Sequence, residues 1–291
     1  ARKIFDEDQV DGFNEFVLGF ALPAMVFVGV VSTPRSVLLG DVALFVGVTA
    51  VQLLFMLLGL VLFRVVLKRD LASSAIVALM ISVPTAAFMG TPILDALFRK
   101  PSSSLAISLY AISVNAVILP LAIVILEWAT RPTDQDQAFG TVLRRVLITT
   151  ASRSIVWSPF VALALVAVGF EPPEPFDASL DLVGEATSAV ALFASGLIIA
   201  RFRVSFGVEP IGLAIIKNIA QPAAMVGIAA VLGITGVARS EAVILTAMPA
   251  SVVGPMFAVR YGSYQSEAAS TLITSTLLSI GTMVAAVLLF G

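Results

Sequence analysis

Long uninterrupted runs of apolar residues are the feature that most constrains how this 291-residue chain can fold. Nine such runs lie between charged or turn-forming stretches, and most of them reach the roughly 20 residues that a transmembrane helix needs. Because their apolar residues are continuous and do not alternate, they predict helices and not the strands of a membrane barrel. The expected spans are residues 14–31, 41–64, 71–98, 102–128, 154–170, 178–200, 210–233, 239–260 and 266–290.

The composition agrees with a membrane protein and excludes much enzyme chemistry. Hydrophobic residues make up 59% of the chain, against about 45–50% in a soluble domain. The chain has no cysteine and no histidine, which removes thiol nucleophiles, disulfides, Cys/His zinc sites and histidine general bases. Its formal charge is −2 and its basic residues are scattered, so no nucleic-acid partner is indicated. We therefore expect neither an enzyme nor a bound metal or cofactor.

Polar residues divide the chain into two halves. We expect residues 1–128 to form the first half, residues 129–153 a cytoplasmic connecting loop, and residues 154–291 the second half. If successive spans alternate in direction, twelve Lys and Arg residues lie in loops on one side and four in loops on the other. Because Lys and Arg favour cytoplasmic loops, this bias predicts the N-terminus inside and the C-terminus outside.

The two halves share a pattern at an offset of 165 positions, the distance between Pro84 and Pro249. The same shift lays residues 102–128 on residues 267–290, whereas the run at 154–170 finds no partner. Two repeats with an odd number of spans would point in opposite directions across the membrane. We therefore expect two inverted five-helix repeats whose first helix is missing from this sequence, which leaves nine spans.

Two matched segments, residues 83–92 and 248–255, are too broken to be regular helices. A proline inside a helix removes a backbone donor, and lipid cannot replace the lost hydrogen bond. We expect Thr91 to cap a half-helix that begins at Pro92, and Gly254 to precede another that begins at Pro255. The two N-termini would attract an anion, while the carbonyl ends before the first prolines would attract a cation. The candidate site residues are Pro84, Thr85, Gly90, Thr91, Pro92, Pro249, Ser251, Gly254 and Pro255.

Further polar residues lie inside the expected spans. Asn115 is well inside its span, where its amide would either bind a carboxylate or hydrogen-bond another helix. Glu185 and Lys217 are charged groups in apolar segments, which are either functional or reach towards the interface. Gln52 matches Lys217 at the 165-residue offset. The candidates for a coupling or polar pathway are Gln52, Glu185, Lys217, Asn218 and Gln221.

Short motifs in a fixed order run through the whole chain. They are Leu22-Pro23-Ala24, Phe88-Met89-Gly90-Thr91-Pro92-Ile93-Leu94, Asn115 with Leu119-Pro120, Ala247-Met248-Pro249-Ala250 through Val259-Arg260-Tyr261-Gly262, and Ala268-Ala269-Ser270-Thr271-Leu272 leading to Thr276-Leu277-Leu278-Ser279. Together they resemble the auxin efflux carrier family, which includes plant auxin carriers and bacterial malonate and malate permease-like proteins. The plant members often have a long central loop, which this chain lacks, so regulation through that loop is not expected.

The resemblance implies a fold shared with bile-acid/sodium symporters, with a scaffold part and a transport part. It also implies that an organic anion binds where the two broken helices cross, near Asn115, Pro84 and Pro249. We therefore expect a secondary transporter of small carboxylates in a bacterial cytoplasmic membrane, working by an elevator-like or rocking motion. The alternatives are a sodium-coupled symporter of the bile-acid type and a membrane receptor that binds a small ligand without moving it. The sequence leaves open the substrate, the direction, a homodimer, and whether Na⁺, H⁺ or no ion drives transport.

Overall fold

The computed structural model describes residues 5–32, 41–98, 102–131, 139–170 and 173–291. Within these ranges the regular secondary structure is helical, with one isolated β-bridge between Pro84 and Ala250. The prediction of an all-helical protein is therefore confirmed.

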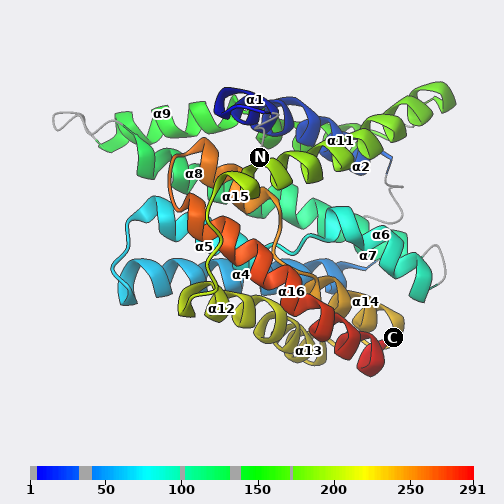
Figure 1. Cartoon of the computed structure of the whole chain (residues 1–291). Helices are drawn as coiled ribbons and strands as arrows, with labels where there is room; N and C mark the ends of the chain where they lie inside the picture. Colours follow the sequence, from blue (N-terminus) through cyan, green and yellow to red (C-terminus); the bar gives the residue numbers. More distant parts are fainter. Residues whose placement is uncertain (1–4, 33–40, 99–101, 132–138, 171–172) are drawn as a thin grey trace.

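Helices fill both halves of the chain (Figure 1). The first half contains α1 (Glu7–Phe16), α2 (Leu22–Val31), α4 (Val42–Val61), α5 (Leu71–Ser82), α6 (Ala86–Leu97), α7 (Ser102–Ile112) and α8 (Leu119–Thr130). The second half contains α10 (Ser154–Ala167), α11 (Glu174–Arg201), α12 (Val208–Ile215), α13 (Gln221–Leu232), α14 (Gly236–Ala247), α15 (Val253–Arg260) and α16 (Gln265–Phe290). Short π-helical segments join some of them, namely η1 (Val17–Ala21), η2 (Leu62–Val66), η3 (Ser113–Ile118) and η4 (Ile216–Ala220).

Five continuous helices among the described residues are long and apolar enough to cross a membrane. They are Glu7–Val31, Val42–Val66, Leu105–Thr130, Val208–Leu232 and Gln265–Phe290. A sixth candidate is a pair of helices, Leu143–Ala151 and Ser154–Ala167, bent by 65° at their junction. These helices support a polytopic membrane protein, while the count of nine spans and the inverted repeat stay predictions.

The connecting segment differs from the expected loop. Residues 129–153 contain helix α9 (Phe139–Ala151), which packs against α8. Val146 is buried in this helix, whereas Arg144 and Arg145 are exposed. Thr150, one turn after Val146, is also buried, so α9 has one buried face, a pattern that the mixed composition of the segment concealed.

Three of the π-helical segments precede a proline at the second position of the following helix. Proline has no N–H, so a carbonyl in the preceding turn loses its partner and the helix widens locally. Within η1, the side chains of neighbouring helices supply donors. Ser154 donates to the Gly19 carbonyl at 2.7 Å, and Thr187 donates to the Ala21 carbonyl at 3.1 Å. The irregular backbone of this span is thus bonded to α10 and α11.

The helices form two groups. Helix α2 packs against α10 and α11, and α1 packs against α11, so these elements lie together along the upper side of Figure 1. The second group contains α4 to α8 with α12 to α16, and α4, α12 and α13 lie along the lower side. The four half-helices α5, α6, α14 and α15 all belong to the larger group, so the breaks lie among packed protein.

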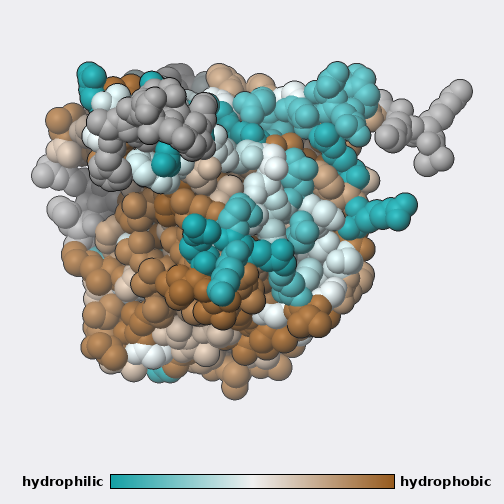
Figure 2. All heavy atoms as spheres, turned by 90° about the vertical axis from the view of Figure 1, so that its left-hand side faces the viewer, coloured by the Kyte–Doolittle hydropathy of each residue, from teal (hydrophilic) through white to brown (hydrophobic). Residues whose placement is uncertain are grey.

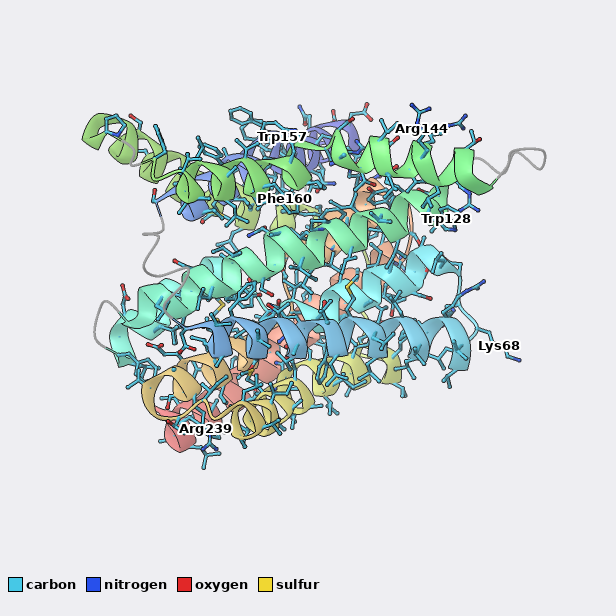
Figure 3. All side chains as sticks on the ribbon, turned by 180° about the vertical axis from the view of Figure 1, so that it is seen from behind. Lys68, Trp128, Arg144, Trp157, Phe160 and Arg239 are labelled. Carbon is cyan, nitrogen blue, oxygen red and sulfur yellow. The ribbon has the colours of Figure 1, made fainter. Side chains whose placement is uncertain are left out.

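Charged side chains gather at the ends of the bundle. Figure 2 views the end where α4 gives way to α5, and hydrophilic residues cover part of this face while hydrophobic residues surround them. Figure 3 shows Lys68 and Arg144 at this same end and Arg239 towards the opposite end. The predicted division of the loops into two sides of the membrane also puts Lys68 and Arg144 on one side and Arg239 on the other. Which side is cytoplasmic stays a prediction.

Helices α4 and α5 approach each other most closely at Gly59. A Cβ atom added there would lie 2.7 Å from the Cα and 3.1 Å from the backbone nitrogen of Ala78. No real Cβ atom approaches backbone so closely, and the backbone of a packed helix cannot give way as a flexible side chain does. Glycine at this position therefore allows the half-helix α5 to rest directly on α4.

We predict that Gly59→Ala destabilises the protein by about 1–3 kcal/mol, because the new methyl group forces α4 away from α5. The matched control is Gly227→Ala in α13, where an added Cβ meets no atom within 4 Å. Thermal unfolding in detergent should give a lower midpoint for Gly59→Ala only. Equal midpoints for the two variants would contradict the close packing of these helices.

Candidate functional site

The two breaks cross and are joined by backbone hydrogen bonds. The Thr85 N–H donates to the Pro249 carbonyl at 2.8 Å, and the Ser251 N–H donates to the Val83 carbonyl at 3.0 Å. Together these bonds make the antiparallel bridge between Pro84 and Ala250. Both bridging segments are buried. The backbone groups left without helical partners at the break in one half of the chain are thus hydrogen-bonded by the break in the other half.

The half-helices begin earlier than we expected. Helix α6 begins at Ala86, directly after the break, and continues through Pro92 to Leu97, so no half-helix begins at Pro92. Thr91 therefore lies within the helix and cannot be its cap, and its side chain is outside the described residues. The physical reason is the bridge, whose last hydrogen bond in this segment is made by the Thr85 N–H. Helical hydrogen bonding begins directly afterwards, with the Met89 N–H donating to the Thr85 carbonyl.

Helix α15 also begins before its proline. Its first residue is Val253, so Gly254 and Pro255 lie in the first turn and Gly254 is not a cap. Gly254 instead allows α15 to pack closely against α5, because an added Cβ would lie 2.5 Å from Cγ of Met80 in α5. Gly90 makes no comparable contact, since the nearest atom to its added Cβ is in Leu245 at 3.4 Å.

The N-termini of the two half-helices differ. In α15 the Val253 N–H lies 3.3 Å from the Ser251 hydroxyl and the Gly254 N–H donates to the Ser251 carbonyl at 3.2 Å, while Pro255 has no N–H. In α6 the side chain of Thr85 makes no capping hydrogen bond. The first turn of α6 is therefore the better end for an added acceptor, and it carries the partial positive charge of a helix N-terminus.

The carbonyl end of the second break is occupied by a lysine. The Lys217 ammonium donates to the carbonyls of Thr246 at 2.9 Å and Met248 at 2.8 Å, and the side chain is fully buried. These carbonyls belong to the last turn of α14 and the residue after it. A positive charge therefore lies at the negative end of this half-helix.

Neutral donors occupy the carbonyl end of the first break. Gln221 donates through Nε2 to the Ser82 carbonyl at 2.7 Å, and the Tyr110 hydroxyl donates to the Pro84 carbonyl at 2.7 Å. Tyr110 was not among our predicted site residues. The signal that could have revealed it is its phenol inside an apolar span, since a buried tyrosine hydroxyl usually finds a hydrogen-bond partner.

Hydrogen bonds of Asn218 and Ser275 connect the last helix, α16, to the crossing. The Asn218 amide donates to the Ser275 carbonyl at 2.7 Å, and the Ser275 hydroxyl donates back to Oδ1 of Asn218 at 2.7 Å. The same hydroxyl accepts from the Ala250 N–H at 2.8 Å. Lys217, Asn218 and Gln221 therefore contact the two breaks or the helix bonded to them.

The hydrogen bonds of Gln52 and Asn115 go to residues outside the bridge. Ser113 donates to Oε1 of Gln52 at 2.6 Å, and Nε2 of Gln52 is buried without a partner among the described residues. Asn115, which is 9% exposed, donates through Nδ2 to the Ala111 carbonyl of its own helix at 2.7 Å. The side chain of Glu185 lies outside the described residues.

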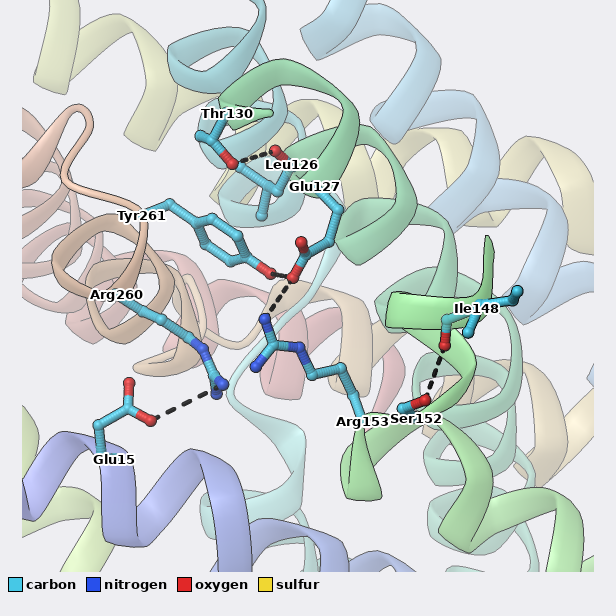
Figure 4. A network of polar contacts seen from close by, with 9 residues as sticks. All are labelled: Glu15, Leu126, Glu127, Thr130, Ile148, Ser152, Arg153, Arg260 and Tyr261. Atoms are coloured by element: carbon cyan, nitrogen blue, oxygen red, sulfur yellow. Dashed lines mark hydrogen bonds and ion pairs between the residues drawn. The ribbon is translucent and has the colours of Figure 1, made fainter. Parts of the chain in front are cut away.

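Ionic contacts hold the far end of α15 (Figure 4). Glu127 of α8 accepts from Arg153 at 2.7 Å and from the Tyr261 hydroxyl at 3.0 Å. Arg260 lies 3.7 Å from Glu15 of α1. Burial and the neighbouring Glu127 carboxylate raise the pKa of Tyr261, so its hydroxyl stays protonated and remains a donor. The half-helix that starts at the crossing is thus linked to α1, α8 and the start of α10.

The described residues also contain an apolar cavity of about 480 Å³ between α13, α14 and α16. Asn218 and Thr282 are its polar residues, and its other lining side chains are apolar. Among the described side chains, no group of three or more acidic residues could hold a metal ion. The lining of this cavity is therefore mostly apolar, whereas Lys217, Gln221 and Tyr110 donate hydrogen bonds at the crossing.

Comparison with known proteins identifies relatives over nearly the whole chain. The family described as membrane transport protein matches residues 1–287. A protein of Escherichia coli K12 named uncharacterized transporter YfdV is 30% identical over 282 residues, which cover 95% of this chain and 87% of the relative. A putative malonate transporter of Rhizobium meliloti is 24% identical over 275 residues, which cover 93% of this chain and 83% of that protein.

We predict that Tyr110→Phe lowers the stability of the crossing by about 1–3 kcal/mol, because the buried Pro84 carbonyl loses its donor. The control is Thr282→Val, since the Thr282 hydroxyl bonds only a carbonyl of its own helix, at 3.3 Å. Hydrogen exchange at the amides of Thr85 and Ser251 should accelerate in Tyr110→Phe and stay unchanged in the control. Unchanged exchange in both variants would mean that the hydroxyl does not support the bridge.

Proposed function

The chain belongs to the membrane transport protein family, the family of the auxin efflux carriers, and from this premise we propose that it carries small carboxylates across a bacterial cytoplasmic membrane. The substrate would bind at the crossing of the two broken helices and reach the two sides of the membrane in turn. The transporter class follows from the family, whereas the substrate class and the site are the proposal.

The observation that carries the proposal is the arrangement of charge at the crossing. Lys217, Gln221 and Tyr110 occupy the carbonyl ends of α14 and α5, so these negative ends are compensated within the protein. The N-terminal end of α6 lacks a cap from Thr85 and keeps its partial positive charge. An anion is therefore the ligand that this region favours, and a carboxylate is one of the anions that bind the N–H groups of a helix N-terminus.

Asn115 is the side chain that we place beside the substrate. Its Nδ2 donates one hydrogen to Ala111, which leaves the second amide hydrogen for a carboxylate oxygen. The residue lies in the π-helical segment η3, and such segments are frequent at functional sites. Thr85 and Ser251 lie in the buried bridge and complete the proposed site.

Equivalent contacts at the 165-residue offset support two inverted repeats. Tyr110 and Ser275 are 165 positions apart, and each hydrogen-bonds the backbone of a break. Gln52 and Lys217 have the same separation, and each is fully buried. We propose that residues 1–128 and 154–291 are inverted repeats of a five-helix unit, with the C-terminus outside.

The two groups of helices suggest how the site would move. The group that contains the breaks would shift against α1, α2, α10 and α11 in an elevator-like motion. The contacts of Glu127 with Arg153 and of Arg260 with Glu15 cross between the groups and would have to open in that motion. In each pair one side chain is at least 36% exposed, which limits the cost of breaking the pair. We propose the smaller group as the scaffold and as the place of any homodimer contact.

The alternatives are less well supported. A sodium-coupled symporter of the bile-acid type would bind its cation at the carbonyl ends, which Lys217 and Gln221 already occupy. A receptor that does not move its ligand has no need of two helices broken at matching positions.

We predict that a carboxylate raises the thermal unfolding midpoint of the purified full-length protein. The first compound to test is malonate, named for one relative, followed by a panel of mono- and dicarboxylates at constant ionic strength. At a concentration of 100 times Kd the stabilisation should reach about 2.7 kcal/mol. Asn115→Ala should abolish it, because the variant loses the amide donor.

The matched control is Thr130→Val in the same span, since that hydroxyl bonds only the Leu126 carbonyl of its own helix at 2.8 Å. It should keep the full response, and uptake of the labelled carboxylate into proteoliposomes should follow the same order of variants. A folded wild-type protein that responds to no carboxylate would contradict the proposed substrate class. A full response in Asn115→Ala would remove Asn115 from the site.

A further inference from the structure

Lys217 is the most unusual charged residue in the described structure. Its side chain has 0% exposure, although lysine is almost never fully buried unless its charge is compensated. It lies in η4, inside a 25-residue apolar helix that is long enough to span a membrane. Holding an ammonium group in such a place is costly and marks a functional group more often than a structural one.

The hydrogen-bond partners of the ammonium are backbone carbonyls. Its two hydrogen bonds go to Thr246 and Met248, at 2.9 and 2.8 Å. The ion pairs formed by described residues do not include Lys217. The charge is therefore balanced by carbonyl dipoles and by the negative end of α14.

Such a cluster of carbonyls has the chemistry of a sodium site. Backbone oxygens at an unwound helix and at the carbonyl end of a half-helix are the ligands that coordinate Na⁺ in transporters with broken helices. Here the helix stops at Ala247 and Met248 is extended, with φ −61° and ψ 152°, so these carbonyls are turned out of the helical ladder. The lysine ammonium lies where a monovalent cation would bind.

The opposite break has no such charge among its described residues. Its carbonyl end is bonded by the Gln221 amide and the Tyr110 hydroxyl, which are both neutral donors. Gln52, the residue 165 positions before Lys217, is also neutral. The described part of the crossing therefore contains one fixed positive charge from the chain itself, at the second break.

We infer that the Lys217 ammonium is a built-in cation that takes the place of a coupling Na⁺ ion at the crossing. This inference rests on the proposed transport function and deepens it by assigning the cation site. The Lys217 ammonium stabilises the carbonyl end of α14 in every step of the transport cycle. Substrate binding therefore does not require sodium. Removing the side chain exposes the carbonyls to a cation from solution.

The test compares wild type, Lys217→Ala and the control Lys68→Ala, each as the full-length purified protein. Lys68 is exposed at one end of the bundle, so its removal deletes a lysine without touching the crossing (Figure 3). Unfolding midpoints are measured in NaCl, in methylammonium chloride and in N-methyl-D-glucamine chloride at equal ionic strength. This readout needs no substrate.

We expect the midpoint of wild type and of Lys68→Ala to be the same in all three salts. In N-methyl-D-glucamine chloride the unfolding midpoint of Lys217→Ala should lie on the order of 10 °C below that of wild type, because the carbonyls of Thr246 and Met248 lose the ammonium that donates to them. Sodium or methylammonium should recover part of that loss, which a merely structural role of the side chain would not allow. A midpoint of Lys217→Ala that neither cation raises would overturn the inference, as would a sodium-specific rise in wild type.

A second measurement keeps the inference testable if Lys217→Ala does not fold. Carboxylate-induced stabilisation of wild type is compared in sodium and in N-methyl-D-glucamine. Equal stabilisation supports the built-in cation, and stabilisation that requires sodium overturns it. Absence of stabilisation in both salts contradicts the proposed substrate class instead. The inference is then decided by the unfolding midpoint of Lys217→Arg, whose larger guanidinium keeps the positive charge. The same midpoint with and without sodium supports the inference, and a midpoint that only sodium raises overturns it.

Discussion

Two reciprocal backbone hydrogen bonds, from Thr85 to Pro249 and from Ser251 to Val83, are the interaction on which the rest of this structure depends. Helices broken in an apolar environment leave polar groups that lipid cannot satisfy, and each costs several kcal/mol unless protein supplies a partner. Each break supplies the partner for the other. The two halves of the chain are therefore not independent, and a break in one half can persist only while the other break lies against it.

Once the breaks are paired, the remaining helix ends determine the electrostatics of the crossing. The carbonyl ends are bonded by Lys217, Gln221 and Tyr110, and the first turn of α15 is satisfied by Ser251. The start of α6 is the end left without a cap from Thr85. The result is a buried region to which Lys217 contributes a positive charge, and the described residues contain no group of three or more acidic side chains that could hold a metal ion. This is the physical basis for preferring an anionic substrate in a member of a transporter family.

The sequence predicted the two breaks, because prolines occur at matching positions in two apolar runs. It misplaced the helix starts, since the local rule puts a proline at the first turn, whereas the bridge ends at Thr85 and lets α6 run through Pro92. It singled out Lys217 as a charge within an apolar span but left open whether the side chain reaches the interface, and it did not predict the partners, which lie 29 and 31 residues further along the chain. Tyr110 was missed although a phenol inside an apolar span is a signal, because its partner, Pro84, is 26 residues away in the sequence. Helix α9 was missed because apolar and basic residues are interspersed in its segment.

The most direct test of this account is a high-resolution structure of the full-length protein with a stabilising carboxylate, determined in a buffer that contains sodium. The account predicts carboxylate density at the first turn of α6 beside Asn115, and the Lys217 ammonium on the carbonyls of Thr246 and Met248 with no separate ion there. Carboxylate density in the apolar cavity between α13 and α16 would contradict the assigned site. A sodium ion on those carbonyls, with Lys217 turned away, would contradict the assigned cation.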